Sequence, residues 1–236
     1  MRPNPGKLGT THHPPGDAPR SRLSPAPAHL ASHATTEART PARTAGATDD
    51  HARALHTLML RLLGVLTFPF LVGLGAQLAV PLPPDGVPMT LQTLAVVLAA
   101  LCLGPRLGTV SMLLYVVVGT AGAAIFAGGE KGLGAIVGQT GGYLVGFVLC
   151  QPVIVAIIKR PDGSIRGWGA MTLAMLAGHA VIFAIGVPWL AIVNGFGLMR
   201  ALEGGLYPFI PGAIVKTVAA VYIGKLAAPW ASRRIW

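Results

Sequence analysis

One lysine stands in the middle of the last long apolar run of the chain. Lys216 is the tenth residue of the run over 207–230, which places it ~14 Å along a helix that rises 1.5 Å per residue. A lysine at the centre of a bilayer costs roughly 2.5–3.5 kcal/mol, so it normally faces a partner or a cavity. Because no acidic residue falls inside any apolar run, the pattern predicts an anionic ligand as the partner. The alternative is a lysine whose stem carries the amine out to the membrane surface.

Amide, hydroxyl and aromatic side chains gather near the ends of the apolar runs that we expect on the same side as Lys216. The candidates for contacts to a ligand are Gln92, Thr90, Tyr143, Gln139, Trp189 and Asn194. Together with one cation, they predict a pocket for a small, partly apolar anion. Taken singly, each could instead anchor its run at the membrane interface, where Trp and Tyr are enriched.

Groups for catalysis or for a cofactor are not apparent in the sequence. His179 lies within an apolar run without an acidic neighbour, so a neutral imidazole bonded to a backbone carbonyl is favoured over a proton relay. The chain has no GxSxG, HExxH or Walker A pattern (GxxxxGK[ST]), and its two cysteines have no metal-binding spacing. We therefore expect neither an enzyme, nor a bound metal or cofactor, nor ATP hydrolysis by this chain.

The composition indicates what must position these side chains. The sequence is 53% hydrophobic and 11% charged, whereas soluble domains average about 25% charged residues. This charge deficit is typical of an integral membrane protein.

Long apolar runs separated by short Gly- and Pro-containing loops predict six membrane-spanning helices. A bilayer core of about 30 Å needs about 20 helical residues, and the runs cover 58–80, 89–104, 107–127, 138–158, 168–193 and 207–230. The fold class predicted is therefore an all-α integral membrane bundle of six helices over residues 58–230. The short second run could be tilted or partly re-entrant, and five helices is the alternative count.

The two ends of the chain are expected to lie outside this domain. Residues 1–57 are rich in Pro, Ala, Thr and Arg and hold six of the seven histidines, a composition that predicts a disordered basic tail. We interpret these scattered histidines as solvated, with loose metal binding as the alternative. Residues 231–236 are predicted to form a short cytoplasmic C-terminal tail.

The net charge of +10 is best explained by topology. With both termini in the cytoplasm, basic residues collect on that side, while the opposite loops hold only Lys131 and Arg200 next to Asp85, Glu130 and Glu203. The cytoplasmic set is Arg53, Arg61, Arg106, Lys159, Arg160, Arg166, Arg233 and Arg234. This asymmetry predicts a multi-pass protein of the cell inner membrane, and no nucleic acid is expected as a partner.

Glycine is dense between residues 119 and 146. These glycines predict a flexible lid over the pocket and close contact between helices. A weaker small-residue pair, Gly75 and Ala79, lies in the first run.

Several segments, in order along the chain, carry a resemblance to a known family. They are Val87–Leu94, Leu103–Gly108, Phe126–Gly129, Thr140–Gly146, Gly186–Ala191 and Pro208–Gly212. In sequence and spacing they resemble the BioY family, the biotin-specific S components of energy-coupling-factor (ECF) transporters. The resemblance covers about residues 58–230.

The resemblance implies a six-helix S component that captures biotin outside the cell. It also implies partners, namely a transmembrane T protein and two ABC-type ATPases, with Gly73, Gly75 and Ala79 as candidate docking positions on the first helix. The last family motif often reads Pro-Gly-Asp with a lysine three residues further on, but this chain has Ala213 and keeps Lys216. The alternative function is a solitary carrier of biotin or another small anion that works without ATPases.

Overall fold

The computed structural model describes residues 42–82 and 86–236. The chain divides into the units Met1–Thr44 and Ala45–Trp236, and the architecture below belongs to the second unit. Its elements are α1 (Ala42–Gln77), β1 (Ala79–Leu82), β2 (Gly86–Thr90), α2 (Gln92–Thr120), the 3₁₀ turn η1 (Ala127–Gly129), α3 (Leu133–Val137), α4 (Gly141–Ile158), α5 (Trp168–Asn194), α6 (Leu198–Gly205) and α7 (Phe209–Arg234).

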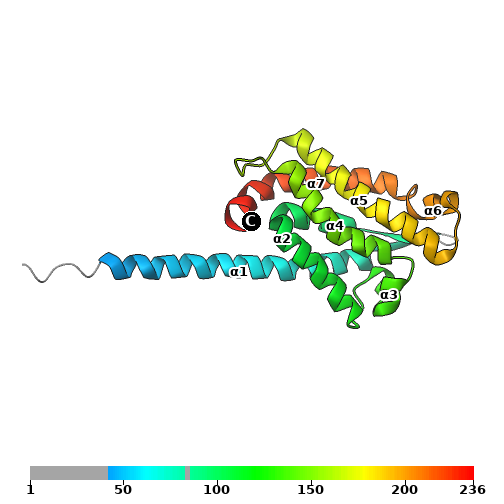
Figure 1. Ribbon diagram of the computed structural model, residues 1–236, viewed down its shortest axis with the longest axis horizontal. Helices are drawn as coiled ribbons and strands as arrows, with labels where there is room; N and C mark the ends of the chain where they lie inside the picture. Colours follow the sequence, from blue (N-terminus) through cyan, green and yellow to red (C-terminus); the bar gives the residue numbers. More distant parts are fainter. Residues whose placement is uncertain (1–41, 83–85) are drawn as a thin grey trace, which may run out of the picture. The chain divides into compact units, whose positions relative to one another are not determined.

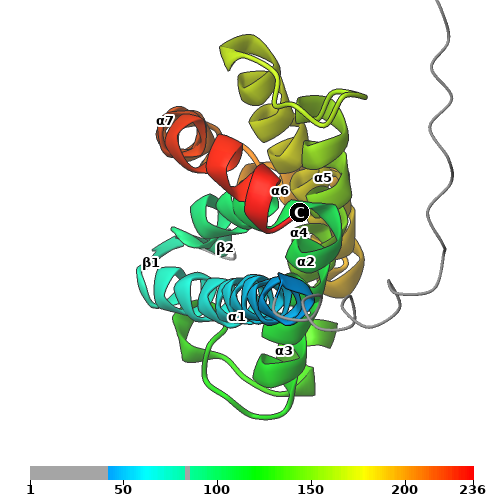
Figure 2. The same cartoon turned by 90° about the vertical axis from the view of Figure 1, so that its left-hand side faces the viewer.

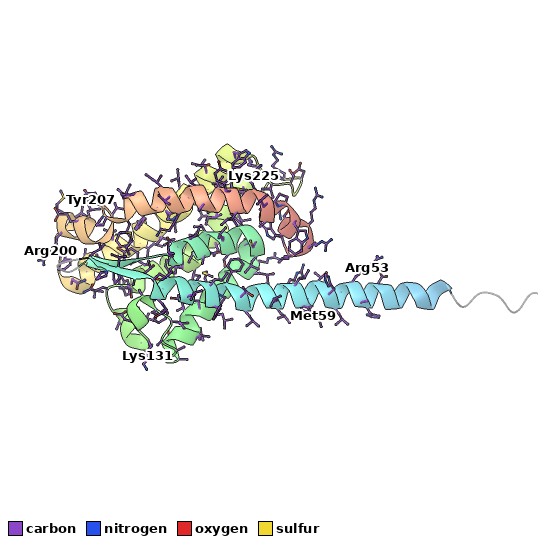
Figure 3. The ribbon with its side chains drawn as sticks, turned by 180° about the vertical axis from the view of Figure 1, so that it is seen from behind. Arg53, Met59, Lys131, Arg200, Tyr207 and Lys225 are labelled. Carbon is purple, nitrogen blue, oxygen red and sulfur yellow. The ribbon has the colours of Figure 1, made fainter. Side chains whose placement is uncertain are left out.

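Four helices form the core of the bundle. α4 packs against α5, α5 against α7, α7 against α2 and α2 against α4, so the four enclose a common apolar interior. Figure 2 looks along α1 and shows that helix to one side of the other four. From behind, α7, the first half of α2 and α1 run next to one another (Figure 3).

The helix α2 is broken at Gly104. This residue has φ 75° and ψ −174°, which is not helical, and Pro105 follows it. Proline lacks the N–H that would continue the helical ladder, and glycine adopts positive φ at little cost. The two halves run in different directions (Figure 1). They correspond to the apolar runs 89–104 and 107–127, which we predicted to be two separate helices.

Within the described residues, five helices are long and apolar enough to cross a membrane: Asp50–Gln77, Gln92–Thr120, Gly141–Ile158, Trp168–Asn194 and Phe209–Arg234. The difference from the predicted count of six lies in α2. The run 168–193 is matched almost residue for residue by α5.

Glycines allow α4 and α5 to approach closely, as the sequence predicted. A Cβ atom built on Gly146 would lie 2.8 Å from Cα of Ile182. At Gly142 it would lie 2.9 Å from the carbonyl oxygen of Ile185. Both neighbours are backbone atoms of α5, so larger residues at these positions would push the helices apart.

The predicted boundaries at the two ends of the membrane domain need correction. α1 begins at Ala42, so the helix includes residues 42–57 of the predicted tail, while residues 1–41 lie outside the described part. The alanine-rich segment before residue 58 favours helix by propensity. At the other end, α7 continues to Arg234 and Ile235 is buried, because apolar side chains in 231–236 pack against Leu103.

A two-stranded hairpin follows α1 and was not predicted, so the fold is not purely helical. β1 and β2 are antiparallel, with Ala79 opposite Thr90 and Val80 opposite Met89. The predicted first and second runs extended into this segment, which contains four prolines. Proline disfavours helix but is tolerated in edge strands, and each strand of a two-stranded sheet is an edge.

Candidate binding site

A small, partly open cavity lies where β2 and the first turn of α2 meet α4, α5 and the start of α7. Its volume is about 40 Å³. Polar groups in its wall come from Thr90, Gln92, Thr93, Thr140 and Tyr143. The apolar lining is formed by Val87, Pro88, Phe126, Ala127, Leu144, Phe147, Ile182, Phe183 and Phe209.

Aromatic rings form one side of this cavity. Tyr143 stacks on Phe209 with 6.5 Å between ring centroids and meets Phe183 edge-on at 6.3 Å. Phe183 and Phe209 are themselves 5.7 Å apart. The hydroxyl of Tyr143 donates to the carbonyl oxygen of Gly205 over 2.9 Å, which ties α4 to the end of α6. Such a cluster offers a fixed apolar surface to a flat or aliphatic ligand.

A chain of hydrogen bonds forms the polar side. The Thr90 hydroxyl donates to Oε1 of Gln92 (2.9 Å), and Nε2 of Gln92 donates to the Tyr115 hydroxyl (2.6 Å). Tyr115 then donates to the carbonyl oxygen of Ile125 (2.9 Å). The chain connects the hairpin, both halves of α2 and the following loop, so it fixes the orientation of the Gln92 amide.

This chain of hydrogen bonds leads to a testable expectation at Tyr115. Tyr115→Phe leaves Nε2 of Gln92 and the Ile125 carbonyl oxygen without these partners in a buried setting. We expect the free energy of unfolding to fall by about 1–3 kcal/mol, measured by thermal unfolding of the purified protein in detergent. Tyr207→Phe is the matched control, because the Tyr207 side chain is exposed. Equal stability of the two variants would show that the Gln92–Tyr115 bond contributes nothing.

Lys216 lies behind the polar side of the cavity. Its Nζ donates to the carbonyl oxygen of Thr90 (2.8 Å) and to Oγ1 of Thr93 (2.9 Å), and only 7% of the residue is exposed. Within 42–82 and 86–236, no carboxylate lies within ion-pair distance of it. Ala213, at the position where the family motif often has Asp, is small and buried. The lysine is therefore held by neutral oxygens of residues that line the cavity, and its charge is not neutralised by them.

His179 has the backbone partner that the sequence favoured. Its Nδ1 lies 2.9 Å from the carbonyl oxygen of Met175, one turn earlier in α5. A carbonyl oxygen can only accept, so Nδ1 carries the hydrogen atom.

Four of the predicted contact residues are not in the wall of the cavity: Lys216, which lies behind it, and Gln139, Trp189 and Asn194. Nε2 of Gln139 donates to Oδ1 of Asn194 over 3.1 Å in an exposed position. Nε1 of Trp189 donates to the carbonyl oxygen of Gly138 over 2.8 Å, which fastens α5 to the segment before α4. The structure brings together Thr90, Gln92, Tyr143 and Lys216, and it places the other three in contacts between loops and helix ends.

Several residues of the cavity were not predicted. Thr93 and the phenylalanines at 126, 147, 183 and 209 belong to it. Thr93 follows Gln92 directly, so the polar start of that run contained the signal. The phenylalanines gave no comparable signal, because an aromatic residue within an apolar run is equally suited to general packing.

The candidate positions for docking a T protein on the first helix are packed against other segments of this chain. A Cβ on Gly73 would lie 3.3 Å from Cβ of Ile125, and one on Gly75 would lie 3.0 Å from the backbone nitrogen of Gln92. Ala79 belongs to β1 rather than to a helix. The exposed face of α1 instead carries a row of large apolar side chains, namely Met59, Leu62, Leu66, Phe70 and Leu74.

A helical bundle that suits a membrane, with a small cavity that has aromatic rings on one side and a buried lysine behind the other, is the arrangement expected of a membrane protein that binds a small molecule. The chain matches the BioY family over residues 48–233 and belongs to that family. This confirms the resemblance seen in the sequence, and places the chain among transporter components rather than enzymes.

Individual relatives and one solved structure agree with this assignment. The chain is 40% identical over 161 residues to the probable biotin transporter BioY of Pyrococcus horikoshii, covering 68% of this chain and 91% of the relative. It is 34% identical over 168 residues to the biotin transporter BioY of Thermotoga maritima, covering 70% and 94%. The fold is similar to that of a crystal structure of the S-component for biotin from an ECF-type ABC transporter, with a TM-score of 0.66, 24% identity, and coverage of 74% and 92%.

Proposed function

We propose that this chain is the biotin-binding membrane subunit of an uptake system and that the cavity beside Lys216 is its substrate site. The observation that carries the proposal is a buried cation without a carboxylate partner in the described residues, placed directly behind an aromatic-walled cavity. Membership of the BioY family and the names of its relatives indicate that the ligand is biotin.

The chemistry of biotin suits this arrangement. Its carboxylate is an ion-pair partner for Lys216, which reaches it from behind Thr90 and Thr93. Its thiophane ring and valeryl chain are apolar and suit the rings of Phe183 and Phe209. Its ureido group has donors and acceptors for the Gln92 amide and the hydroxyls of Thr90 and Tyr143. Gln139, Trp189 and Asn194 then act on the site through the loops that they hold together.

Binding of biotin requires the cavity to widen. About 40 Å³ holds roughly one water molecule, and ligand pockets of protein sites usually measure about 300–1,000 Å³. The glycine-rich segment 121–140 that borders the cavity through Phe126 and Ala127 has several residues at positive φ, including Gly122, Gly128 and Gly132. This segment and the hairpin are the parts of the wall that we expect to move.

We further propose six membrane segments, with each half of α2 counted as one, and both termini in the cytoplasm. The basic end of the bundle then faces inward, as the positive-inside rule requires, and the inner membrane is the location. The cavity, near the start of α7 and far from Arg233 and Arg234, opens toward the outside.

Transport energy is proposed to come from partners, a T protein and two ABC-type ATPases. The exposed apolar row of α1 is the face available to the T protein, because Gly73 and Gly75 are already packed within the chain. The other candidate, a solitary carrier, would use the same site without ATPases. Co-purification from a native membrane separates them: recovery of a T protein and ATPases supports the first, and uptake by this chain alone in liposomes supports the second.

Titration calorimetry of the purified full chain with biotin tests the proposal directly. We expect saturable binding of one biotin per chain, competition by desthiobiotin, and none by thiamine, which carries a cation where biotin carries an anion. A folded sample that does not bind biotin would overturn the proposed function.

A further inference from the structure

A basic groove lies at the end of the bundle away from the substrate cavity. Its volume is about 380 Å³, and it is lined by Ala52, Arg53, His56, Thr57 and Leu60 of α1 and by Arg234 of α7. Nε of Arg61 donates to the carbonyl oxygen of Ile235 over 2.9 Å. This bond links α1 to the end of α7 next to the groove.

Among the side chains of residues 50–82 and 86–236, no carboxylate lies within ion-pair distance of Arg53 or Arg234. The Arg234 guanidinium lies 5.5 Å from the centre of the Trp230 ring. A guanidinium offers a planar fork of donors that matches two oxygens of a phosphate. Two arginines from different helices around one groove therefore define an anion site.

The depth of the groove specifies what kind of anion it meets. Arg53 precedes Gln77, the last residue of α1, by 24 residues, or ~36 Å of helix at 1.5 Å per residue. The apolar core of a bilayer measures about 30 Å, so with Gln77 at the outer boundary of that core Arg53 reaches headgroup level. Leu60 is 17 residues from Gln77, ~26 Å, and lies within the apolar layer. Near Leu60 on α1, the apolar side chains of Met59 and Leu63 are 67% and 64% exposed, as expected of residues that face lipid. Figure 3 shows Arg53 and Met59 along α1, with Arg200 and Tyr207 at the opposite end of the molecule.

We propose that this groove binds the headgroup of an anionic phospholipid. The phosphodiester lies between Arg53 and Arg234, and the first methylenes of an acyl chain run along Leu60. A free phosphate would use the two arginines but not the apolar floor. The inference does not depend on biotin binding, because the two sites lie at opposite ends of α7.

Native mass spectrometry of the full chain in a neutral detergent tests the proposal. The protein is incubated with phosphatidylglycerol or with phosphatidylcholine of the same acyl chains. We expect one phosphatidylglycerol to be retained in preference to phosphatidylcholine. In the double variant Arg53→Gln, Arg234→Gln, the apparent affinity falls at least about tenfold. The double variant Arg53→Lys, Arg234→Lys keeps both positive charges and should retain most of the affinity for phosphatidylglycerol.

A matched control removes the same charge from the same end of the bundle. Arg106→Gln with Arg166→Gln alters two exposed arginines that do not line the groove, and we expect unchanged lipid retention. Equal losses in both double variants would show diffuse surface attraction and overturn the proposal. Displacement of the lipid by millimolar inorganic phosphate would overturn it in favour of a simple anion site. Biotin binding by each variant verifies that it is folded.

Discussion

Replacing Lys216 by methionine lowers the affinity for biotin by at least about 100-fold, because the substrate carboxylate then enters a buried site without its cation. Methionine matches the length of the lysine stem and carries no charge. The Thr90 carbonyl oxygen and the Thr93 hydroxyl lose a donor, at a cost of about 1–3 kcal/mol, and removal of the buried charge offsets part of this cost, so we expect a folded, membrane-inserted variant. Titration calorimetry measures the loss.

Two comparisons make this result specific. Biotin amide lacks the carboxylate, so wild-type protein should prefer biotin over the amide and Lys216→Met should not distinguish them. Lys225→Met removes another cation of α7, one that lies 5.2 Å from the centre of the Trp168 ring, and should bind biotin normally. A Lys216→Met protein that keeps the wild-type preference for biotin would show that the carboxylate lies elsewhere.

Replacing Gly146 by alanine lowers the free energy of unfolding by about 1–3 kcal/mol, the usual cost of excess volume in a close-packed interior. The added methyl group would lie 2.8 Å from Cα and 3.2 Å from the carbonyl oxygen of Ile182. Backbone atoms cannot rotate away as a side chain can, so α4 and α5 must separate. Thermal unfolding in detergent measures the effect.

Gly169→Ala is the control for this variant. Gly169 lies in the first turn of α5, and nothing would lie within 4 Å of an added Cβ. Alanine is the better helix former, so we expect no loss of stability. If Gly146→Ala is as stable as Gly169→Ala, the contact between α4 and α5 has room that the structure does not show.

The strongest features of the fold and the site followed from local sequence. The run 168–193 predicts α5 because length and apolarity alone decide a membrane helix. Lys216 was identified by the cost of a charge in an apolar run, and it lies next to the cavity. The break at Gly104 was recognised as a loop, because glycine and proline both interrupt a helix, although the structure continues one element across it.

What could not be predicted depends on contacts between distant segments. The prolines of the hairpin indicate that the first helix ends there, but the pairing of the two apolar strands depends on contacts that the local sequence does not show. Trp189 and Asn194 have side chains suited to a ligand, but Gly138 and Gln139 on another element engage them. Gly75 was read as an outward-facing small residue, but the folded chain places the start of α2 against it.

The small volume of the substrate cavity has a kinetic consequence. Because biotin cannot fit into about 40 Å³, each association and each dissociation must wait for the wall to open. We therefore expect the association rate constant to lie below the diffusion limit, because binding requires a conformational change. Dissociation is slowed by the same barrier, so the lifetime of the complex is long for its affinity. A protein with these rates would respond slowly to a change in external biotin and would retain each captured molecule for a long time.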